Sequence, residues 1–292
     1  MRRGLPWALL GLVGLAAGLG AGLGLAGAPA GGPNQAWVAQ VLATTRDAGT
    51  VRFTFSGVTT SPNHLLRATH SGWGAADFAS GSARATEISR QTSLSSDSTS
   101  PPHPSASTQQ LNEVSLRHSV YLGIHFPGHS QIFWSRFGPS HLGSRGALGL
   151  DYTSASGALG ALSAANRVVQ IDDLGPQVTG GVATTEYRVL TQPVCEAGPG
   201  SPSSTTNGPT DLWLDGDGRL VQARGVSYSD VRAQGPSAGR TTHAFDGRST
   251  TTEVVRFHDF GVPLHITAPH IQPRALGNGS IAFSTLRAQC SA

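Results

Sequence analysis

Apolar and polar residues alternate along much of the chain from residue 51 onward, which is the pattern of half-buried β-strands. In residues 51–56, for example, Phe53 and Phe55 fall on one face and polar residues on the other. Further strands are predicted over residues 64–69, 73–88 with a turn at 80–82, 111–124, 168–172, 181–190, 211–214, 220–228, 240–245 and 250–257. This makes roughly ten short strands, so the sequence predicts a mainly β protein built on an antiparallel sheet.

Residues 215–218, Asp-Gly-Asp-Gly, separate two of these strands. Asp and Gly accept the backbone angles of tight turns, so a hairpin is predicted here. The run shares letters with a calcium-binding loop, but the twelfth position counted from Asp215 is Val226 and not the acidic residue that closes such a loop. A plain turn is therefore the better interpretation.

Two segments have helical patterns. Residues 34–48 start at a capping residue, Asn34, and repeat apolar side chains at helical spacing, ending before Gly49. Residues 154–165 offer a serine cap and Leu159 and Leu162 three positions apart, although their glycines weaken the helix.

Two polar segments interrupt the strand pattern. Residues 89–110 are rich in Ser, Thr, Pro and Gln, and offer too little apolar surface to offset the entropy of ordering, so a mobile loop is predicted. Residues 196–209 form a second polar insert.

The N-terminus combines a short basic start with an apolar stretch over residues 8–28 and small residues after it. Residues 1–30 are therefore predicted to be an export signal or a membrane anchor. The Ala-x-Ala-like end favours cleavage, whereas a stretch of roughly 20 apolar residues is also long enough to span a bilayer. The remainder, residues 34–290, is expected to form a single extracytoplasmic domain, secreted or anchored by the N-terminal helix.

Composition narrows the class of protein further. Only 13% of residues are charged, and Gly (38) and Pro (18) are abundant, which suits a turn-rich β protein. The formal net charge is +3 and there is no basic run, so the sequence lacks the electrostatic signature of a nucleic-acid-binding protein.

The chain has two cysteines, Cys195 and Cys290. In an exported protein, such a pair is most simply a disulfide, which here would tie the C-terminal tail to a mid-chain loop; two free thiols are the alternative. Neither has a Cys or His at metal-ligand spacing, so no metal site is predicted there.

Eleven histidines invite a metal or catalytic hypothesis, which their surroundings do not favour. Pro127 and Gly128 break any helix that would bring His125 and His129 together. His258 and Asp259 are neighbours on a predicted strand and point to opposite faces. Residues 128–132 begin like a nucleophile elbow but lack its final glycine. We expect no metal, no cofactor and no catalytic residues.

The order of these segments resembles the LolA-like superfamily, and most closely the LppX/LprAFG-type envelope lipoproteins. The stretches that carry the resemblance are residues 51–55 (VRFTF), 168–175 (VVQIDDLG), 182–190 (VATTEYRVL), 212–220 (LWLDGDGRL) and 254–269 with FHDFG at 257–261. Each motif is short, and the match runs from about residue 37 to residue 269. Unlike the lipoprotein members, the chain has no Cys after the apolar stretch to accept a lipid.

The resemblance implies a strongly bent antiparallel sheet, a half-barrel, with helices across its concave face and an apolar cavity between the two. Members of the superfamily carry or sense acyl chains. Candidate cavity-wall residues are the apolar side chains at alternating strand positions, Phe53, Phe55, Val114, Leu116, Tyr187, Val189, Leu212, Leu214 and Phe257. The same residues would equally pack as a solid core, since a core and a cavity wall demand the same residue types.

Three functional hypotheses follow. The leading one is a non-enzymatic cell-envelope protein that binds or carries a lipid or lipidated molecule. The second keeps the fold but makes it a membrane-tethered extracytoplasmic sensor with a protein partner, at a membrane surface or on a membrane protein. The third and weakest is a secreted hydrolase that uses the histidines.

Overall fold

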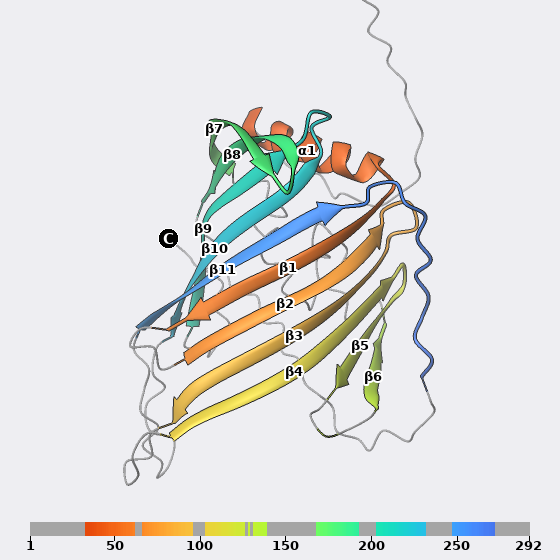
Figure 1. Ribbon diagram of the computed structural model, residues 1–292, viewed down its shortest axis with the longest axis vertical. Helices are drawn as coiled ribbons and strands as arrows, with labels where there is room; N and C mark the ends of the chain where they lie inside the picture. Colours follow the sequence, from red (N-terminus) through yellow and green to blue (C-terminus); the bar gives the residue numbers. More distant parts are fainter. Residues whose placement is uncertain are drawn as a thin grey trace, which may run out of the picture. The chain divides into compact units, whose positions relative to one another are not determined.

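The computed structural model describes residues 33–61, 66–95, 103–125, 128, 131–138, 168–192, 203–231 and 247–271. The chain divides into Met1–Ala30 and a compact unit, Gly31–Ala292, that holds every described element. This unit contains the helix α1 (Pro33–Asp47) and one antiparallel sheet (Figure 1). Its strands are β1 (Thr50–Thr60), β2 (Leu66–Asp77), β3 (Ser82–Ser95), β4 (His103–Leu116), β5 (Ser119–His125), β6 (Ile132–Phe137), β7 (Val168–Thr179), β8 (Val182–Thr191), β9 (Ser203–Leu214), β10 (Leu220–Val231) and β11 (Gly247–His258).

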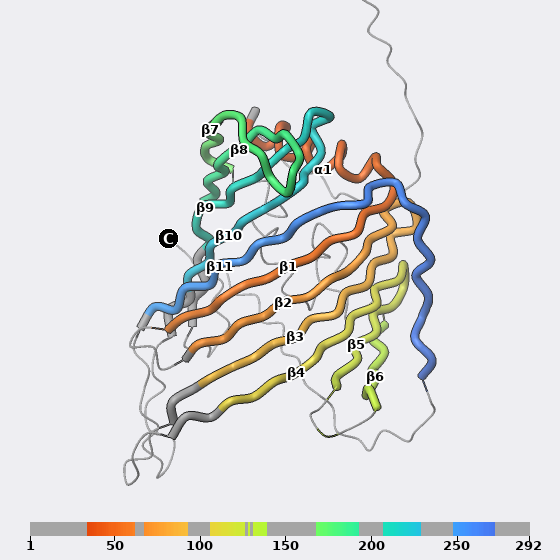
Figure 2. Tube along the Cα trace, in the orientation of Figure 1, coloured from red at the N-terminus to blue at the C-terminus, as the bar shows by residue number. Residues whose placement is uncertain are grey.

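The sheet consists of two meanders joined at its centre. Its strand order is β6-β5-β4-β3-β2-β1-β11-β10-β9-β8-β7, so every neighbour is also a neighbour in the chain except β1 and β11. These two strands pair with Phe53 opposite Phe257, and Figure 2 shows the first and last strands lying side by side. Strands β6 and β7 are the two edges, so the sheet is open. The predicted fold class, a bent antiparallel half-barrel with a helix across one face, is confirmed.

Helix α1 forms where the apolar spacing predicted it. Val38 and Val41 are buried against the sheet, while the residues on the opposite side of the helix are exposed. Gly49 adopts a φ of 78°, and its N–H donates to the Arg46 carbonyl, which closes the last turn. The helix lies over the β7–β10 part of the sheet: the Trp37 ring packs 4.9 Å from that of Tyr187 on β8.

A buried threonine links the helix to the sheet. The Thr45 hydroxyl donates to the Val41 carbonyl oxygen (2.8 Å) and accepts from the Leu220 backbone N–H of β10 (3.0 Å). Because both partners are inaccessible to water, no solvent molecule can replace this hydroxyl.

We therefore expect Thr45→Val, which keeps the shape but removes the hydroxyl, to lower the free energy of unfolding by about 1–3 kcal/mol, the cost of leaving a buried N–H unpaired. Urea denaturation followed by circular dichroism measures this difference. Thr54→Val, at an exposed position of β1, is the matched control and should stay close to wild type. Equal effects of the two substitutions would contradict a structural role for the Thr45 hydroxyl.

The hairpin predicted at residues 215–218 is confirmed, and its geometry explains why Asp occupies its first position. The Asp215 carboxylate accepts from the backbone N–H groups of Asp217 (3.0 Å) and Arg219 (2.9 Å), as in an Asx-turn. It also pairs with the Arg219 side chain at 2.8 Å. Gly218 has a φ of 78°, which glycine adopts without strain.

The polar segment 89–110 is not a loop throughout, and the prediction of a mobile loop was wrong for most of it. Residues of β3 and β4 pair across it from Ser89 and Gln109 to Ser95 and His103. Backbone hydrogen bonds between neighbouring strands form whatever side chains the strands carry. The side chains of residues 90–92 and 106–109 are exposed. The hairpin therefore extends past the core with polar side chains on both faces.

Other strand boundaries also differ from the sequence pattern. Part of the second polar insert, residues 203–209, belongs to β9. The predicted strand 111–124 is two strands, because residues 117 and 118 form a turn between β4 and β5. The segment 126–144 is turn-rich in sequence, but its apolar residues 132–137 form the edge strand β6.

Several predictions concern residues outside the described part of the chain. These are the N-terminal segment 1–30, the helix 154–165, the strand 240–245, and both members of the Cys195–Cys290 pair. Within the described ranges, no helix has the length and hydropathy needed to cross a membrane.

Candidate functional site

The two faces of the sheet differ in what they carry. We call the face on which α1 lies the inner face and the opposite one the outer face. The register assigns each residue to a face, since side chains opposite one another on paired strands share it. One inner-face row runs from Phe257 through Phe53 to Gly74, Ala85, Glu113 and Leu122.

A buried cluster occupies the inner face under α1. It contains Val38 and Val41 of the helix and side chains of β1, β2, β3, β8, β9, β10 and β11. Phe53 is at its centre, with the rings of Phe55 and Phe257 each 6.3 Å away. This cluster joins the two meanders across the β1–β11 pair.

The rings of Phe53 and Phe55 lie along the sheet. A Cβ atom added at Gly74 would overlap the Phe53 ring, and one added at Gly72 would overlap the Phe55 ring. Each phenyl ring therefore extends sideways across β2, into space that only glycine leaves free. The side chains of this part of the inner face consequently stand low above the backbone.

Beyond these rings the inner face remains low. Gly72, Gly74 and Ala76 on β2 adjoin Ala83 and Ala85 on β3, and we call these five residues the small-residue strip. On its far side β5 presents larger side chains, Val120 and Leu122, which are buried but do not belong to the cluster under α1. The strip is therefore a band of small apolar residues, with Ala76, Ala83 and Ala85 buried, and strand β4 separates it from the larger side chains of β5.

Seven of the nine predicted wall residues lie at the inner face. Six are buried in the cluster: Phe53, Phe55, Val189, Leu212, Leu214 and Phe257. Tyr187 is half-buried against it and contacts Trp37.

Val114 and Leu116 are not brought together with the other seven. Val114 pairs with Arg84 and Tyr121, and all three belong to the outer face. Leu116 is two positions further along β4 and shares that face. Alternation along β4 places Val114 and Leu116 on the face opposite to Glu113 and Ser115, and the register with β3 shows that Glu113 and Ser115 face inward.

The inner face also carries polar groups that the sequence did not single out. Nε2 of His70 on β2 lies 3.3 Å from Oε1 of Glu253 on β11, and both side chains are largely buried. They meet above Gly57 of β1, where a side chain would overlap the imidazole. The pair is close enough for an ionic contact, although Nε2 lacks hydrogen-bond geometry to any described group.

Strand β4 adds further polar groups to the inner face, besides the His70–Glu253 pair. Glu113 and Ser115 are both fully buried at the inner face, between the small-residue strip and β5. The inner face is thus apolar on either side of a narrow polar line. Such a surface suits a ligand with long apolar parts and a polar group.

The signal for the strip was present in the sequence. In residues 71–76, Ser-Gly-Trp-Gly-Ala-Ala, small residues recur at every second position around Trp73. Hydrophobic periodicity identifies large apolar residues as candidates for a cavity wall. A strand face made of glycine and alanine is therefore not identified by it. Among the described residues, no group of three or more His, Cys, Asp or Glu side chains is placed to hold a metal ion.

No protein-family model matches the chain, and no curated protein matches its sequence. Comparison of the fold with solved structures gives several matches. The lipoprotein LppX of Mycobacterium tuberculosis shares 13% identity, with a TM-score of 0.37 over 80% of this chain and 97% of that one. LprF from Mycobacterium bovis shares 11% with a TM-score of 0.33, covering 81% and 96%. A lipoprotein-sorting protein domain from Vibrio parahaemolyticus shares 8% with a TM-score of 0.25, covering 80% and 94%. At these identities the comparisons concern the fold alone.

Proposed function

We propose that this protein is a non-enzymatic cell-envelope protein that binds a lipid or lipidated molecule against the inner face of its sheet. The observation that supports this most directly is the small-residue strip between the Phe53–Phe55 rings and the larger side chains of β5. Acyl chains are the ligands, and the protein acts outside the cytoplasm.

The space for a ligand on this face depends on how far the side chains rise above the backbone. Ala76, Ala83 and Ala85 carry only a methyl group where a Leu or Phe would rise higher, while the Phe55 and Phe53 rings already cover Gly72 and Gly74. An acyl chain lying there would remove apolar surface from water, which is worth about 25 cal/mol per Å², or roughly 0.8 kcal/mol for each methylene group. The Phe53 and Phe55 rings would contact one flank of the chain, while the polar line of β4 separates its other flank from Val120 and Leu122.

Within this proposal, the polar groups of the inner face contact the polar part of the ligand. The His70–Glu253 pair lies at Gly57, beyond the Phe55 end of the strip. An imidazole nitrogen without a hydrogen-bonding partner can donate to or accept from a headgroup once an acyl chain is in place. The wall residues Phe53 and Phe55 would contact the chain, whereas Val114 and Leu116 on the outer face would not.

The test is whether the protein holds lipid. We expect an organic extract of the purified, folded chain to contain acylated molecules by mass spectrometry, and the delipidated protein to take up a fluorescent fatty acid with saturable binding. Heat-denatured protein at the same concentration controls for adhesion to exposed apolar surface. An extract without acyl species, together with no uptake by the folded protein, would reject lipid binding.

A second role, a membrane-tethered regulatory module with a protein partner, is favoured by the edge strand β7. Val169, Leu174 and Val178 of this strand are exposed, the last at 76%. Since β7 ends the sheet, its outer backbone groups can pair with a strand from another protein. Retention of residues 1–30 in the mature protein and co-purification of a membrane protein would support this role over lipid carriage.

A further inference from the structure

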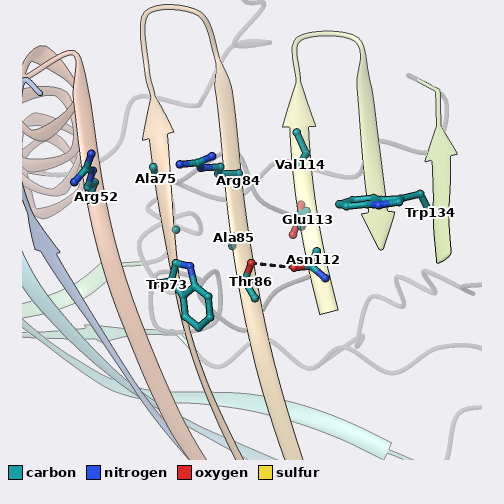
Figure 3. Close-up of a pocket in the computed structure, with 11 residues that line it drawn as sticks. Arg52, Trp73, Ala75, Arg84, Ala85, Thr86, Asn112, Glu113, Val114 and Trp134 are labelled. Carbon is teal, nitrogen blue, oxygen red and sulfur yellow. Dashed lines mark hydrogen bonds between the residues drawn. The ribbon is translucent and has the colours of Figure 1, made fainter. Parts of the chain in front are cut away.

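A second site lies on the outer face, opposite the strip. It is an open pocket of about 440 Å³ over β1 to β4 and β6, within the size range of small-molecule sites. Figure 3 shows Trp73 and Trp134 at two sides of the pocket. Arg84 on β3 and Asn112 on β4 lie between the two tryptophans. Nothing in the proposed lipid site uses these residues.

The pocket follows from one cross-strand row. Trp73, Thr86, Asn112, Gly123 and Trp134 stand opposite one another on β2, β3, β4, β5 and β6. The two tryptophans thus end the row four strands apart, which is about 19 Å between backbones. Short side chains lie between them, so the indoles rise on either side of a lower floor.

Both indoles are placed to contact a ligand. Trp73 is 55% exposed, which is unusual for so large an apolar side chain. Trp134 leans across β5: a Cβ at Gly123 would lie only 2.9 Å from two atoms of its indole. Glycine at this position therefore lets the Trp134 ring lie over the floor of the pocket.

Asn112 supplies an unused donor at this floor. Its side-chain oxygen accepts from the Thr86 hydroxyl (3.0 Å) and from Nε2 of Gln110 (3.3 Å). Asn112 is only 9% exposed, and its Nδ2 group has no hydrogen-bond partner among the described residues. A buried amide donor facing a pocket is satisfied when a ligand supplies an acceptor.

Two arginines add donors to the pocket, while Thr86 gives its hydroxyl proton to Asn112, and Glu113, also part of the lining, is at an inner-face position. Arg84 lies in the adjacent row between Ala75 and Val114, and no ion pair of its guanidinium is found within the described ranges. Arg52 contacts Asp259 at 3.5 Å through exposed side chains. The indole N–H and guanidinium groups only donate, and the Asn112 acceptor is already occupied.

We infer that the outer pocket binds an anionic saccharide, a sugar ring that carries a carboxylate or a phosphate. The acidic group would accept hydrogen bonds from the Arg84 guanidinium, and a ring oxygen or hydroxyl would accept from Nδ2 of Asn112. The negative faces of the indoles attract the C–H groups of a sugar ring. This site is independent of the proposed lipid binding, since it lies on the other side of the sheet.

Binding is measured on the full chain by tryptophan fluorescence and calorimetry, with four probes: a short oligosaccharide of glucuronic acid, its neutral glucose counterpart, glucose 6-phosphate and inorganic phosphate. We expect the glucuronate oligomer to bind about tenfold or more tightly than the neutral one, the loss expected for a charge-assisted pair. Glucose 6-phosphate should bind more tightly than inorganic phosphate. The two charged probes tell a carboxylate-bearing glycan from a sugar phosphate.

Three substitutions assign the binding to this pocket. Arg84→Gln should weaken glucuronate binding about tenfold and leave the neutral oligosaccharide unchanged, while Arg224→Gln, at an exposed outer-face position of β10, should change neither. Asn112→Asp keeps the oxygen that Thr86 and Gln110 bind but replaces the donor, and should weaken every saccharide. Trp73→Phe should retain binding that Trp73→Ala loses.

Circular dichroism confirms that each variant is folded. Equal losses of glucuronate affinity in Arg84→Gln and Arg224→Gln would overturn the inference. They would mean that the protein's net positive charge, and not Arg84 in the pocket, attracts the ligand. Equal affinity for neutral and acidic oligosaccharides would overturn the anionic assignment. Binding to phosphatidylglycerol vesicles with none to any saccharide would make the pocket a membrane contact and would also overturn it.

Discussion

Phe53→Ala lowers the free energy of unfolding by about 3–5 kcal/mol, the cost typical of deleting a buried phenyl ring. Phe53 is 1% exposed and contacts Phe55 and Phe257 at the junction of the two meanders. Its ring also covers Gly74, so its loss leaves a void on two strands. Urea unfolding followed by circular dichroism measures the change.

Trp73→Ala is the matched control for this loss. It removes a larger ring one strand away, but from the outer face and from a site that is 55% exposed. Its effect on unfolding should stay well below that of Phe53→Ala. A loss of less than about 1 kcal/mol for Phe53→Ala would mean that this ring borders open space and is not packed in a core.

Ala85→Phe weakens lipid uptake while the protein stays folded. Ala85 lies at the centre of the inner-face row between Gly74 and Glu113, so a phenyl ring there occupies the space above the small-residue strip. We expect the fluorescent fatty acid to bind at least about tenfold more weakly, because a methylene that is no longer buried forfeits roughly 0.8 kcal/mol. Fatty-acid titration and urea unfolding are measured on the same preparation.

Thr54→Phe places the same ring on the outer face of β1 and controls for added apolar surface. It should leave fatty-acid uptake unchanged. If the inner face were packed solid, Ala85→Phe would instead destabilise the fold by about 1–3 kcal/mol through overpacking, and any uptake would be unaffected. That pattern would refute an acyl site above the strip and favour the regulatory role.

Local patterns predicted much of the fold. The helix α1 was predicted almost to its ends, because apolar spacing and Gly49 are local signals. The Asp215 hairpin was likewise predicted from turn chemistry. The β3–β4 hairpin was missed at residues 89–95 and 103–110, since polar strands that extend past a core have no hydrophobic pattern to mark them.

The candidate sites were only partly predictable. Large side chains such as Phe53 and Leu212 were found by alternation, and the structure places them in one cluster. Gly72 and Gly74 were not, because their contribution is the space they leave for rings on β1. Asn112 gave no signal at all, since its burial, the partners of its oxygen and the lack of a partner for Nδ2 all depend on the strand pairing.

The sequence by itself determined the helix α1, the apolar stretches of strands such as β1 and β8, and the turn at residues 215–218, because these depend on residues within a few positions of one another. Only the tertiary structure decided that β1 pairs with β11, that Val114 faces outward, and that Trp73 and Trp134 end one row. These relations join strands up to about 200 residues apart in the chain, and period-2 alternation is the same whichever partner and face a strand takes.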